Sequence, residues 1–497
     1  MQSTFHLPEA LIEHLPGPDQ SSKVWIVGGA LRDHLLGRSY EDVDFAVKGD
    51  AIELARTLAD AWSWDFFILD DERGAARVLS KDPRLSIYRM DFSRLRDDNI
   101  EADLQDRDFT INALAIDVHA PSALIDPTGG VQDLRQRKLR ACGPDTLHQD
   151  PVRVIRAVRF ATEFELTIDR DTIDQIKQAV GGIQDVSIER TRDELFRIFN
   201  GQHVGEAVTL LDHLGILDAV FPDIHRFKLS SNGGNGEQST WQLKLAQIRT
   251  LSDLIHILEP EHDAEAAADA IWGSVSLRLG RFRKPVSDHL KVCLADERSN
   301  RSLIYYLVLR SLRDPGGGFE FERLEPGSRR SSQYLAVDHD LVERAQAFRL
   351  SRHECDYLQN ASDAYRFLES ALEADEWTDL GIHRYFQTFG EGGLGAVLLF
   401  LSHAAARMAG PPDAEVWERR LSIARGLWEA YFERHQEIIA PDPVVDGLDL
   451  IQELGLDSGP QIGVLLRAIT EAQVTRRVQS RKDALELASE LISSADN

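Results

Sequence analysis

The chain has 497 residues, enough for roughly three or four domains that each bury a core of their own. Hydrophobic residues make up 43% and charged residues 28%, as is typical of soluble globular proteins. No run approaches the ~18 apolar residues of a membrane span, and the N-terminal segment lacks the basic and apolar regions of a signal peptide. Three scattered cysteines give neither a disulfide framework nor zinc-ligand spacing, so we expect a cytoplasmic protein without membrane segments.

The formal net charge of −26 argues against indiscriminate binding to nucleic acid. Residues 131–160 depart from this background, with seven basic residues against three acidic ones and a net charge of +4. The basic residues are Arg135, Arg137, Lys138, Arg140, Arg153, Arg156 and Arg159. This stretch predicts either a local basic surface for an anionic partner or ordinary charge balancing on a solvated helix.

The first predicted elements surround a pair of glycines. Residues 24–27 read VWIV, and their length and β-branched content are typical of a buried strand. Gly28 and Gly29 interrupt this strand, and an apolar helical pattern follows until Gly37. Glycine lets the backbone approach a ligand closely and a helix N-terminus favours negative charge, so this segment is a candidate phosphate-binding turn. An ordinary turn is the alternative.

A second predicted strand carries two acidic residues. Asp42 and Asp44 alternate with Val43 and Phe45, and the two-residue period of a strand places both carboxylates on one face. Two carboxylates in this arrangement can jointly hold two Mg²⁺ ions about 4 Å apart, the spacing used in phosphoryl transfer. Solvated surface residues or a cap at the strand end are the alternative interpretation.

The pattern up to about residue 126 mixes strands and helices, which predicts an α/β head domain. Residues 51–61 are helical by pattern, 66–69 and 76–79 are strand-like, 86–92 alternate, and 111–118 form a strand or the start of one. Asp91 lies in the alternating segment. It is a candidate third carboxylate beside Asp42 and Asp44, or it simply ends its strand.

Residues 103–117 contain a basic and an acidic residue side by side. Arg107 can neutralise phosphate charge, with Asp108 holding its guanidinium or contacting a ribose hydroxyl. A structural salt bridge between these neighbours is the alternative.

A further helix is predicted from residue 150 onward, since Asp150 followed by Pro151 has the form of a cap and a first helical residue. Three arginines recur there every three residues and form one stripe, with apolar residues facing inward. The arginines are Arg153, Arg156 and Arg159, and the apolar residues are Val154, Ile155 and Val158. Beyond this helix the chain is mainly helical by pattern.

Four stretches together resemble the signature of the class II tRNA nucleotidyltransferases and bacterial poly(A) polymerases. They are GGALRDHLLGR at 28–38, EDVDF at 41–45, DRDFTINA at 106–113 and HQDPVRVIRAVRF at 148–160. The resemblance covers roughly residues 23–224. It departs from the family pattern at Asp106, where an arginine is usual, and at Gln149, where a glutamate is usual.

The resemblance implies an α+β protein, with a mixed-sheet head followed by helical domains. The expected divisions are a lead-in at 1–22, the catalytic head at 23–143, a neck at 144–224, a flexible linker at 225–240, a body at 241–440 and a tail at 441–497. We expect the body to lack a phosphohydrolase metal site, because its pairs His262-Asp263 and His339-Asp340 have no second histidine cluster nearby.

Site roles also follow from the resemblance. Asp42 and Asp44 would hold two Mg²⁺ ions, with Asp91 as a third carboxylate of the catalytic centre. Gly28, Gly29, Arg32 and Arg107 would cradle the phosphates. Asp150 and Arg153 would select the incoming base, and Arg156 and Arg159 would lie toward the triphosphate.

The implied activity is template-independent addition of CMP and AMP, from CTP and ATP, to complete the CCA end of tRNA. The implied partner is the acceptor arm of tRNA, with arginines of the tail as contacts to its backbone. Alternatives with the same fold are an A-adding enzyme, a CC-adding enzyme and a poly(A) polymerase. A non-catalytic RNA-binding relative is an alternative of another class.

Overall fold

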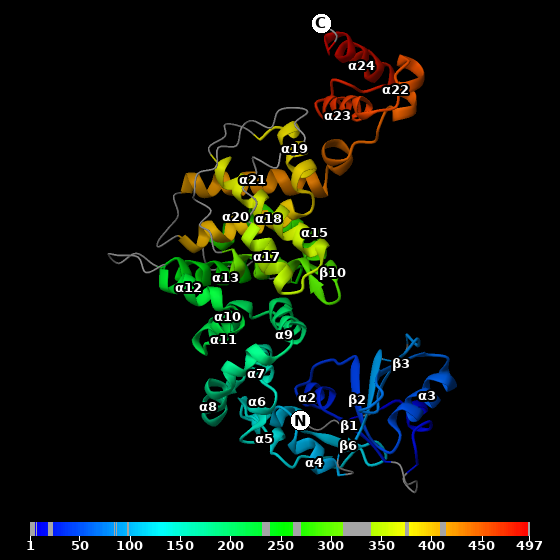
Figure 1. The fold of residues 1–497 in the computed structure, drawn as a ribbon, viewed down its shortest axis with the longest axis vertical. Helices are drawn as coiled ribbons and strands as arrows, with labels where there is room; N and C mark the ends of the chain where they lie inside the picture. Colours follow the sequence, from blue (N-terminus) through cyan, green and yellow to red (C-terminus); the bar gives the residue numbers. More distant parts are fainter. Residues whose placement is uncertain are drawn as a thin grey trace. The chain divides into compact units, whose positions relative to one another are not determined.

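The computed structural model describes residues 5, 7–17, 23–83, 85, 87–96, 99–230, 239–261, 270–311, 339–372, 377–407 and 414–495. The chain divides into two compact units, one formed by Met1–Glu194 with Leu210–Val220 and the other by Leu195–Thr209 with Phe221–Asn497. The first unit contains a seven-stranded sheet, and the second is mainly helical (Figure 1). The predicted α+β fold class is confirmed.

A mixed sheet forms the centre of the head. Its strands are β1 (Lys23–Val27), β2 (Asp42–Lys48), β3 (Asp65–Asp70), β4 (Ala75–Leu79), β5 (Arg89–Arg94), β6 (Ala115–Asp117) and β7 (Leu124–Ile125). They lie in the order β3-β4-β5-β2-β1-β6-β7, with β2 and β5 parallel and the other neighbours antiparallel. Helix α3 (Ala51–Trp62) packs against β3, β4 and β5.

Alternation along β2 decides which face each of its side chains takes. Val43 and Phe45 are each 1% exposed, whereas Asp42 and Asp44 are exposed. The Phe45 ring stacks on Phe92 of β5, with the ring centroids 4.7 Å apart. Because slipping the register by one residue would expose this aromatic pair, the buried rings hold the two carboxylates on the opposite face.

Shorter helices surround the sheet and continue after it. They are α2 (Gly29–Leu35), α4 (Ile100–Gln105), α5 (Gly130–Arg135), α6 (Thr146–Gln149), α7 (Arg153–Glu163), α8 (Arg170–Ala179) and α11 (Ile216–Val220). Helices α9 (Ile188–Asn200) and α10 (Val204–His213) each contain a division between the two units. In α7 the side chains of Val154, Ile155 and Val158 are fully buried, as the arginine stripe predicted.

Two predicted boundaries near the site are wrong. The helix expected to start at Pro151 begins at Arg153, after a turn formed by Pro151 and Val152. The strand expected over 111–118 is reduced to β6, and a 3-10 turn occupies Thr110–Asn112. This turn forms because the side chains of Thr110 and Asn112 are used in buried hydrogen bonds, to Asp133 and to Arg32.

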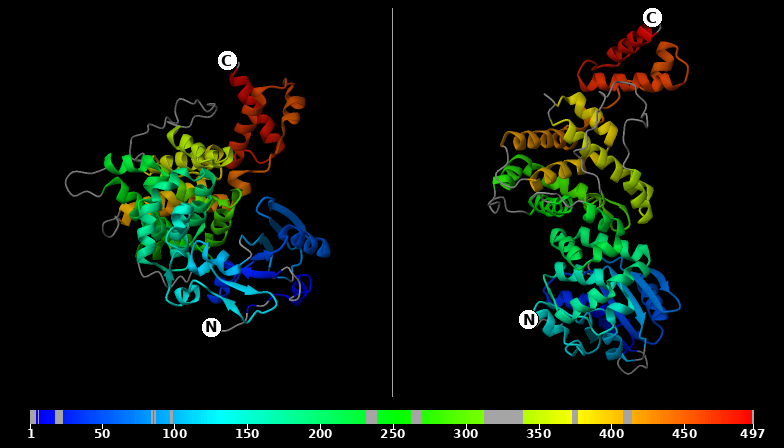
Figure 2. Two further views of the ribbon diagram at one scale, coloured as in Figure 1. Left: turned by 60° about the horizontal axis from the view of Figure 1, so that its bottom comes forward. Right: turned by 60° about the vertical axis from the view of Figure 1, so that its left-hand side comes forward.

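The second unit is built from helices around a buried centre of α13, α18 and α20. Its described helices are α12 (Pro222–Ser230), α13 (Thr240–Ile257), α14 (Ala270–Leu279), α15 (Arg283–Lys291), α16 (Asn300–Arg310), α17 (His339–Ala347), α18 (Arg352–Ser370), α19 (Asp379–Phe389), α20 (Gly392–Arg407) and α21 (Ala414–Phe432). The last described helices are α22 (Gly447–Leu454), α23 (Pro460–Val474) and α24 (Arg481–Ala495), coloured orange to red in Figure 2. They enclose a small core around Leu450 and Ile469.

Some expectations concern residues outside this description. The expected linker at 225–240 includes 231–238, and the pair His262-Asp263 is also outside the described residues. The proposed domain boundaries therefore stay predictions. Of the helices that are described, none is by itself long and apolar enough to cross a membrane, and α19 with α20 pass that test only as a pair bent by 107°.

The contact between α5 and the 3-10 turn generates a stability prediction. A Cβ atom at Gly130 would lie 2.0 Å from the backbone carbonyl oxygen of Thr110, so an alanine there forces the two segments apart. We predict that Gly130→Ala lowers the free energy of unfolding by about 1–3 kcal/mol. Thermal unfolding followed by circular dichroism measures this change.

Gly181→Ala is the matched control, because no heavy atom lies within 4 Å of a Cβ built there. We expect it to change the free energy of unfolding by less than about 0.5 kcal/mol. Equal melting temperatures for the two variants would contradict the close packing of α5 on the turn.

Candidate active site

Three carboxylates of neighbouring strands occupy one region of the sheet. In the parallel pairing of β2 with β5, Asp44 is opposite Asp91, and Asp42 is opposite Arg89. Asp42 and Asp44 share a face because they are two residues apart, and Asp91 joins them because neighbouring strands lie only about 4.8 Å apart. The structure therefore brings the three predicted acidic residues together, and they line one cavity of about 370 Å³.

Each carboxylate has an arginine beside it. Asp42 accepts a hydrogen bond from Arg89. Asp91 accepts two from Arg77, with Nε to Oδ1 and Nη2 to Oδ2 both at 2.8 Å. Such contacts with a guanidinium fix the orientation of a carboxylate.

The pKa values of two of these groups are raised. Although Asp44 keeps accessible surface, neighbouring protein atoms partly desolvate its carboxyl and raise the pKa of that group; the charges of Asp91 and Asp42 add to the rise, and Arg107 opposes it. Burial likewise raises the pKa of Asp42, against the lowering effect of Arg89. Repulsion between like charges is the energetic strain that a bound cation relieves.

Gly28 lets Arg107 approach the start of α2. Its φ is +75°, and a Cβ at this position would lie 2.8 Å from Nη1 of Arg107 and 3.5 Å from Oδ2 of Asp44. Any other residue would push the guanidinium away from the carboxylates. At Gly29 a Cβ would make only an ordinary contact, 3.5 Å from Nη2 of Arg32.

Arg107 has a different carboxylate partner from the one expected. Its Nη2 lies 3.5 Å from Asp103, whereas Asp108 points to Arg156. The expectation that Asp108 holds Arg107 is therefore wrong, because the two neighbours leave the chain in different directions. The Nε of Arg107 is buried and has no hydrogen-bond partner among the described residues, so it has donor capacity left for a ligand.

Arg32, expected at the phosphates, is largely occupied by protein contacts. It is 8% exposed, its Nη1 donates to Asn112 at 2.6 Å, and its Nε donates to Asp33 at 2.9 Å. The guanidinium also lies over the Phe164 ring, 4.2 Å from its centroid. These contacts hold α2 against α7, although Arg32 still lines the cavity of the carboxylates.

A second and larger cleft of the same unit, about 810 Å³, holds the residues expected to meet the base. Arg107, Asp150, Arg153 and Arg156 line it, together with Arg190 of α9. The side chain of Asp150 does not cap α7, whose first turn follows Val152, but accepts a hydrogen bond from Arg190 at 2.7 Å. The capping interpretation of Asp150 is therefore wrong.

The other two arginines of α7 are held by acidic side chains. Arg156 donates to Oδ2 of Asp108 from Nε at 2.9 Å and from Nη2 at 2.5 Å. Arg159 donates from Nε to Glu194 at 2.8 Å. Arg156 lines the cleft, whereas Arg159 is not among the residues that do.

Four charged residues that organise this site were missed in the sequence. Arg89 precedes Asp91 by two residues, so the same period of two already placed it on the carboxylate face. Arg77 follows only from strand pairing, since it lies opposite Asp91 across the β4–β5 ladder. Arg190 and Glu194 contact residues 40 and 35 positions away, and no local pattern identifies such partners.

The donors present fit a divalent cation at Asp42 and Asp44. Carboxylate oxygens are the ligands that Mg²⁺ prefers, and these two share a cavity in which their charges are not fully balanced. In the described part of the chain, no group of three or more His, Cys, Asp or Glu side chains is arranged closely enough to hold a metal ion by itself. A cation there would therefore take its remaining ligands from substrate or water.

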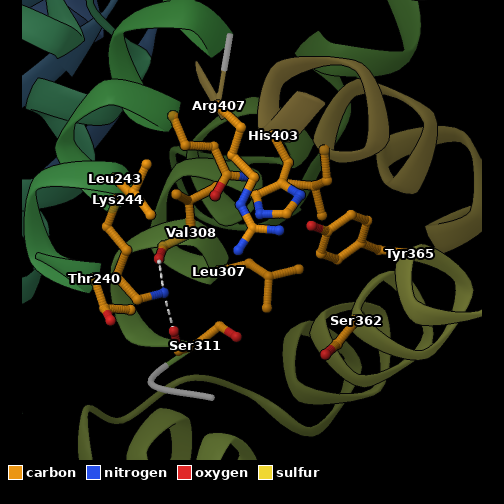
Figure 3. A pocket seen from close by; sticks show the side chains of 12 residues that line it. Thr240, Leu243, Lys244, Leu307, Val308, Ser311, Ser362, Tyr365, His403 and Arg407 are labelled. Carbon is orange, nitrogen blue, oxygen red and sulfur yellow. Dashed lines mark hydrogen bonds between the residues drawn. The ribbon is translucent and has the colours of Figure 1, made fainter. Parts of the chain in front are cut away.

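The second unit has a cavity of its own between α13, α16, α18 and α20 (Figure 3). Lys244 reaches across it and donates from Nζ to the carbonyl oxygens of Val308 and Ser311 (Figure 3). These carbonyls belong to the last turn of α16, so Lys244 satisfies acceptors that a helix end leaves open. Its described contacts are those of a structural residue.

Comparison with known proteins gives matches to two family models. A family model described as the poly A polymerase head domain matches residues 24–140, and one described as a probable RNA and SrmB-binding site of polymerase A matches 165–228. These two matches confirm the resemblance to the tRNA nucleotidyltransferase and poly(A) polymerase family over the stretches that they cover. Its strand–Gly–Gly–helix turn and its paired carboxylates both fall within the first match.

Similar members of this family differ in their named activity. The chain is 41% identical over 197 residues to the CC-adding tRNA nucleotidyltransferase of Geobacter sulfurreducens. This alignment covers 40% of this chain and 45% of that protein. It is 28% identical over 467 residues to the A-adding tRNA nucleotidyltransferase of Deinococcus radiodurans, covering 92% of this chain and 93% of that protein.

A solved structure of a CCA-adding enzyme with CTP has the same fold. The TM-score is 0.62 at 19% sequence identity, and the match covers 98% of both chains. The arrangement of a mixed-sheet head followed by helices is thus shared with nucleotidyltransferases over nearly the whole length.

The contacts of Asp108 generate a pH prediction. Burial alone would raise the pKa of its carboxyl, but Arg156, the Asn112 amide and the Phe109 N–H outweigh burial and hold the pKa below its ordinary value. Such a group stabilises the folded state fully above its unfolded pKa of about 4, and this contribution disappears as the pH falls through the folded pKa. We predict that Asp108→Asn lowers the free energy of unfolding at about pH 7 by roughly 1–3 kcal/mol.

The same reasoning predicts that the difference between Asp108→Asn and the unchanged protein narrows as the pH falls below about 4. Urea unfolding at several pH values between about 3 and 7 measures it. Asp60→Asn, on the exposed side of α3, is the control and is expected to stay within about 0.5 kcal/mol throughout. A difference that widened in acid would contradict the assignment.

Proposed function

We propose that this chain is a tRNA nucleotidyltransferase that transfers nucleotides from CTP and ATP to the 3′ end of tRNA without a nucleic-acid template. The observation that carries the proposal is the position of Asp42 and Asp44 on one face of β2, with Arg107 beside Asp44. The match to the poly A polymerase head domain model supports it, as do the names of the similar proteins.

The residues around Gly28 suit a triphosphate. Arg107 presents a buried Nε without a partner among the described residues, and its Nη1 lies against Gly28, so its guanidinium is held where phosphate oxygens can accept from it. Arg89 and Arg77 hold the carboxylates of Asp42 and Asp91 in fixed orientations. The cavity therefore combines acceptors for cations with a donor for phosphate.

Metal chemistry completes this arrangement. Asp42 and Asp44 are the residues that would hold divalent cations, and two bound Mg²⁺ ions would supply activation of the RNA 3′-hydroxyl and neutralisation of charge on the departing pyrophosphate. The part of this chain is to hold the carboxylates in place and to orient the triphosphate.

The cleft of Asp150 and Arg153 suits the base. Asp150 offers acceptor oxygens, and Arg153 offers donors from a guanidinium that also contacts the carbonyl oxygen of Thr146 at 3.2 Å. An acceptor beside a donor reproduces one edge of a base, so the protein itself can choose the incoming nucleotide. The two residues that depart from the family pattern lie next to this pair. Gln149 precedes Asp150 in the chain, and the carbonyl oxygen of Asp106 accepts a hydrogen bond from Arg153 at 3.4 Å.

The product that we propose first is the complete CCA end. A second candidate is a narrower output, because relatives that align over more than nine-tenths of this chain are an A-adding enzyme and a CC-adding enzyme. Addition of CC alone is also the named activity of the relative with 41% identity.

Replacement of either metal-holding carboxylate tests the catalytic assignment. We predict that Asp42→Asn and Asp44→Asn each reduce nucleotide transfer to below about 1% of the unchanged rate, because the cations lose a charged ligand. Incorporation of labelled CMP and AMP into a tRNA transcript measures the rate. Binding of tRNA, measured by filter retention, is expected to stay within about twofold.

Asp60→Asn provides a control for charge loss elsewhere on the head and is expected to keep the full transfer rate. Residual activity well above about 1% in both site variants would contradict the assignment of Asp42 and Asp44.

Three transcripts that end before CCA, after C and after CC test the product. With Mg²⁺, CTP and ATP, we predict ordered addition of C, C and A that stops there. Addition restricted to CC, or to A on the CC-ending transcript, would establish the narrower enzyme, and unlimited addition of A would make the chain a poly(A) polymerase. Absence of incorporation on all three transcripts would contradict the proposed function.

A further inference from the structure

Arg190 contacts the residue that we expect to meet the base. It belongs to α9, and its Nη2 donates to Oδ2 of Asp150 at 2.7 Å. The Nε of Arg153 lies 3.8 Å from the same oxygen. Both cations therefore act on Oδ2, and together they fix the orientation of the Asp150 carboxylate.

The other oxygen of Asp150 is available to a ligand. Among the hydrogen bonds of the described residues, none has Oδ1 of Asp150 as its acceptor, and the Asp150 side chain is 26% exposed. Asp150 and Arg190 both line the cleft of about 810 Å³. The contact with Arg190 thus leaves Oδ1 as the oxygen that Asp150 can offer to a ligand in the cleft.

One directed acceptor separates the four bases into two classes. Cytosine and adenine carry an exocyclic amino group, which donates hydrogen bonds, whereas uracil and guanine carry a carbonyl oxygen at the corresponding position. A carboxylate oxygen bonds an amino group and repels a carbonyl oxygen. Discrimination requires the carboxylate to stay in place, because a carboxylate that turns away leaves a gap that water fills.

We propose that Arg190 is a positioning residue for base selection, which holds Oδ2 of Asp150 so that Oδ1 accepts from the amino group of cytosine or adenine and disfavours uracil and guanine. This inference rests on the proposed function and deepens it. The local sequence of α9 does not indicate that Arg190 contacts Asp150, because the two residues are 40 positions apart in the chain. Without Arg190 the carboxylate would turn toward Arg153 and lose its direction.

Equilibrium binding of Mg²⁺–CTP and Mg²⁺–UTP to the full chain tests the proposal without depending on catalysis. The unchanged protein is expected to bind CTP more tightly than UTP by about tenfold or more, as one correctly placed hydrogen bond to a base provides. Arg190→Gln is expected to remove most of this preference, chiefly by weakening the binding of CTP. Arg190→Lys keeps a cation but lacks the planar guanidinium. Its preference for CTP over UTP is expected to lie between those of the unchanged protein and Arg190→Gln.

Arg197→Gln is the matched control, since Arg197 lies on the same helix, is about half-exposed and contacts Glu297 at 3.4 Å. It makes the same change of charge and is expected to keep the CTP preference. A double variant, Asp150→Asn with Arg190→Gln, is expected to have the same preference for CTP over UTP as Asp150→Asn alone, because Arg190 acts through Asp150.

Two results would overturn the proposal. One is a CTP preference in Arg190→Gln that stays within about twofold of that of the unchanged protein. If tRNA binding by this variant is also weaker, with a shallower salt dependence, Arg190 is assigned to the RNA backbone. The other is equal binding of CTP and UTP by the unchanged protein. A protein that prefers CTP in binding and loses this preference in Arg190→Gln, yet transfers no nucleotide, would support the inference and overturn the proposed function.

Discussion

The buried carboxylate of Asp108 is the interaction on which the geometry of the first unit depends. It accepts hydrogen bonds from Asn112 and from Arg156 of α7, and Asn112 accepts in turn from Arg32 of α2. The glycine turn, the 3-10 turn and the arginine helix therefore share one network of charge-assisted hydrogen bonds. Because a buried charge that loses its partner is costly, this network is stable only when all its members are in place. The larger cleft, which Asp108 and Arg156 both line, takes its form from this requirement.

The parts of this arrangement that have a short sequence period could be predicted. The two-residue alternation along β2 predicted that Asp42 and Asp44 lie on one face and Val43 and Phe45 on the other. The structure shows the same division between exposed and buried side chains. The start of α7 could not be predicted in the same way. Asp150 and Pro151 have the composition of a helix start, but the carboxylate is engaged by Arg190, and a tertiary contact therefore displaces the local cap.

Contacts between distant residues account for what the sequence did not reveal. Arg107 and Asp108 are neighbours of opposite charge and suggest a pair, but neighbouring side chains point in different directions and each binds a residue elsewhere. Arg77 meets Asp91 only because β4 and β5 pair in one register. Such partners depend on how strands and helices are aligned, which composition and periodicity do not specify.

The same pairing resolves the contrast between an acidic chain and an anionic substrate. The basic stretch around α7 is largely balanced within the unit, because five arginines in or near it are held by acidic side chains: Arg107 by Asp103, Arg153 and Arg190 by Asp150, Arg156 by Asp108 and Glu194, and Arg159 by Glu194. A polyanion that enters must exchange partners with these carboxylates instead of meeting an uncompensated positive surface. Binding then gains little from charge alone and depends on geometry, which limits the non-specific attraction that a surface of bare arginines exerts on any nucleic acid. A net charge of −26 is thus compatible with the proposed recognition of a triphosphate and an RNA end by shape and by directed hydrogen bonds.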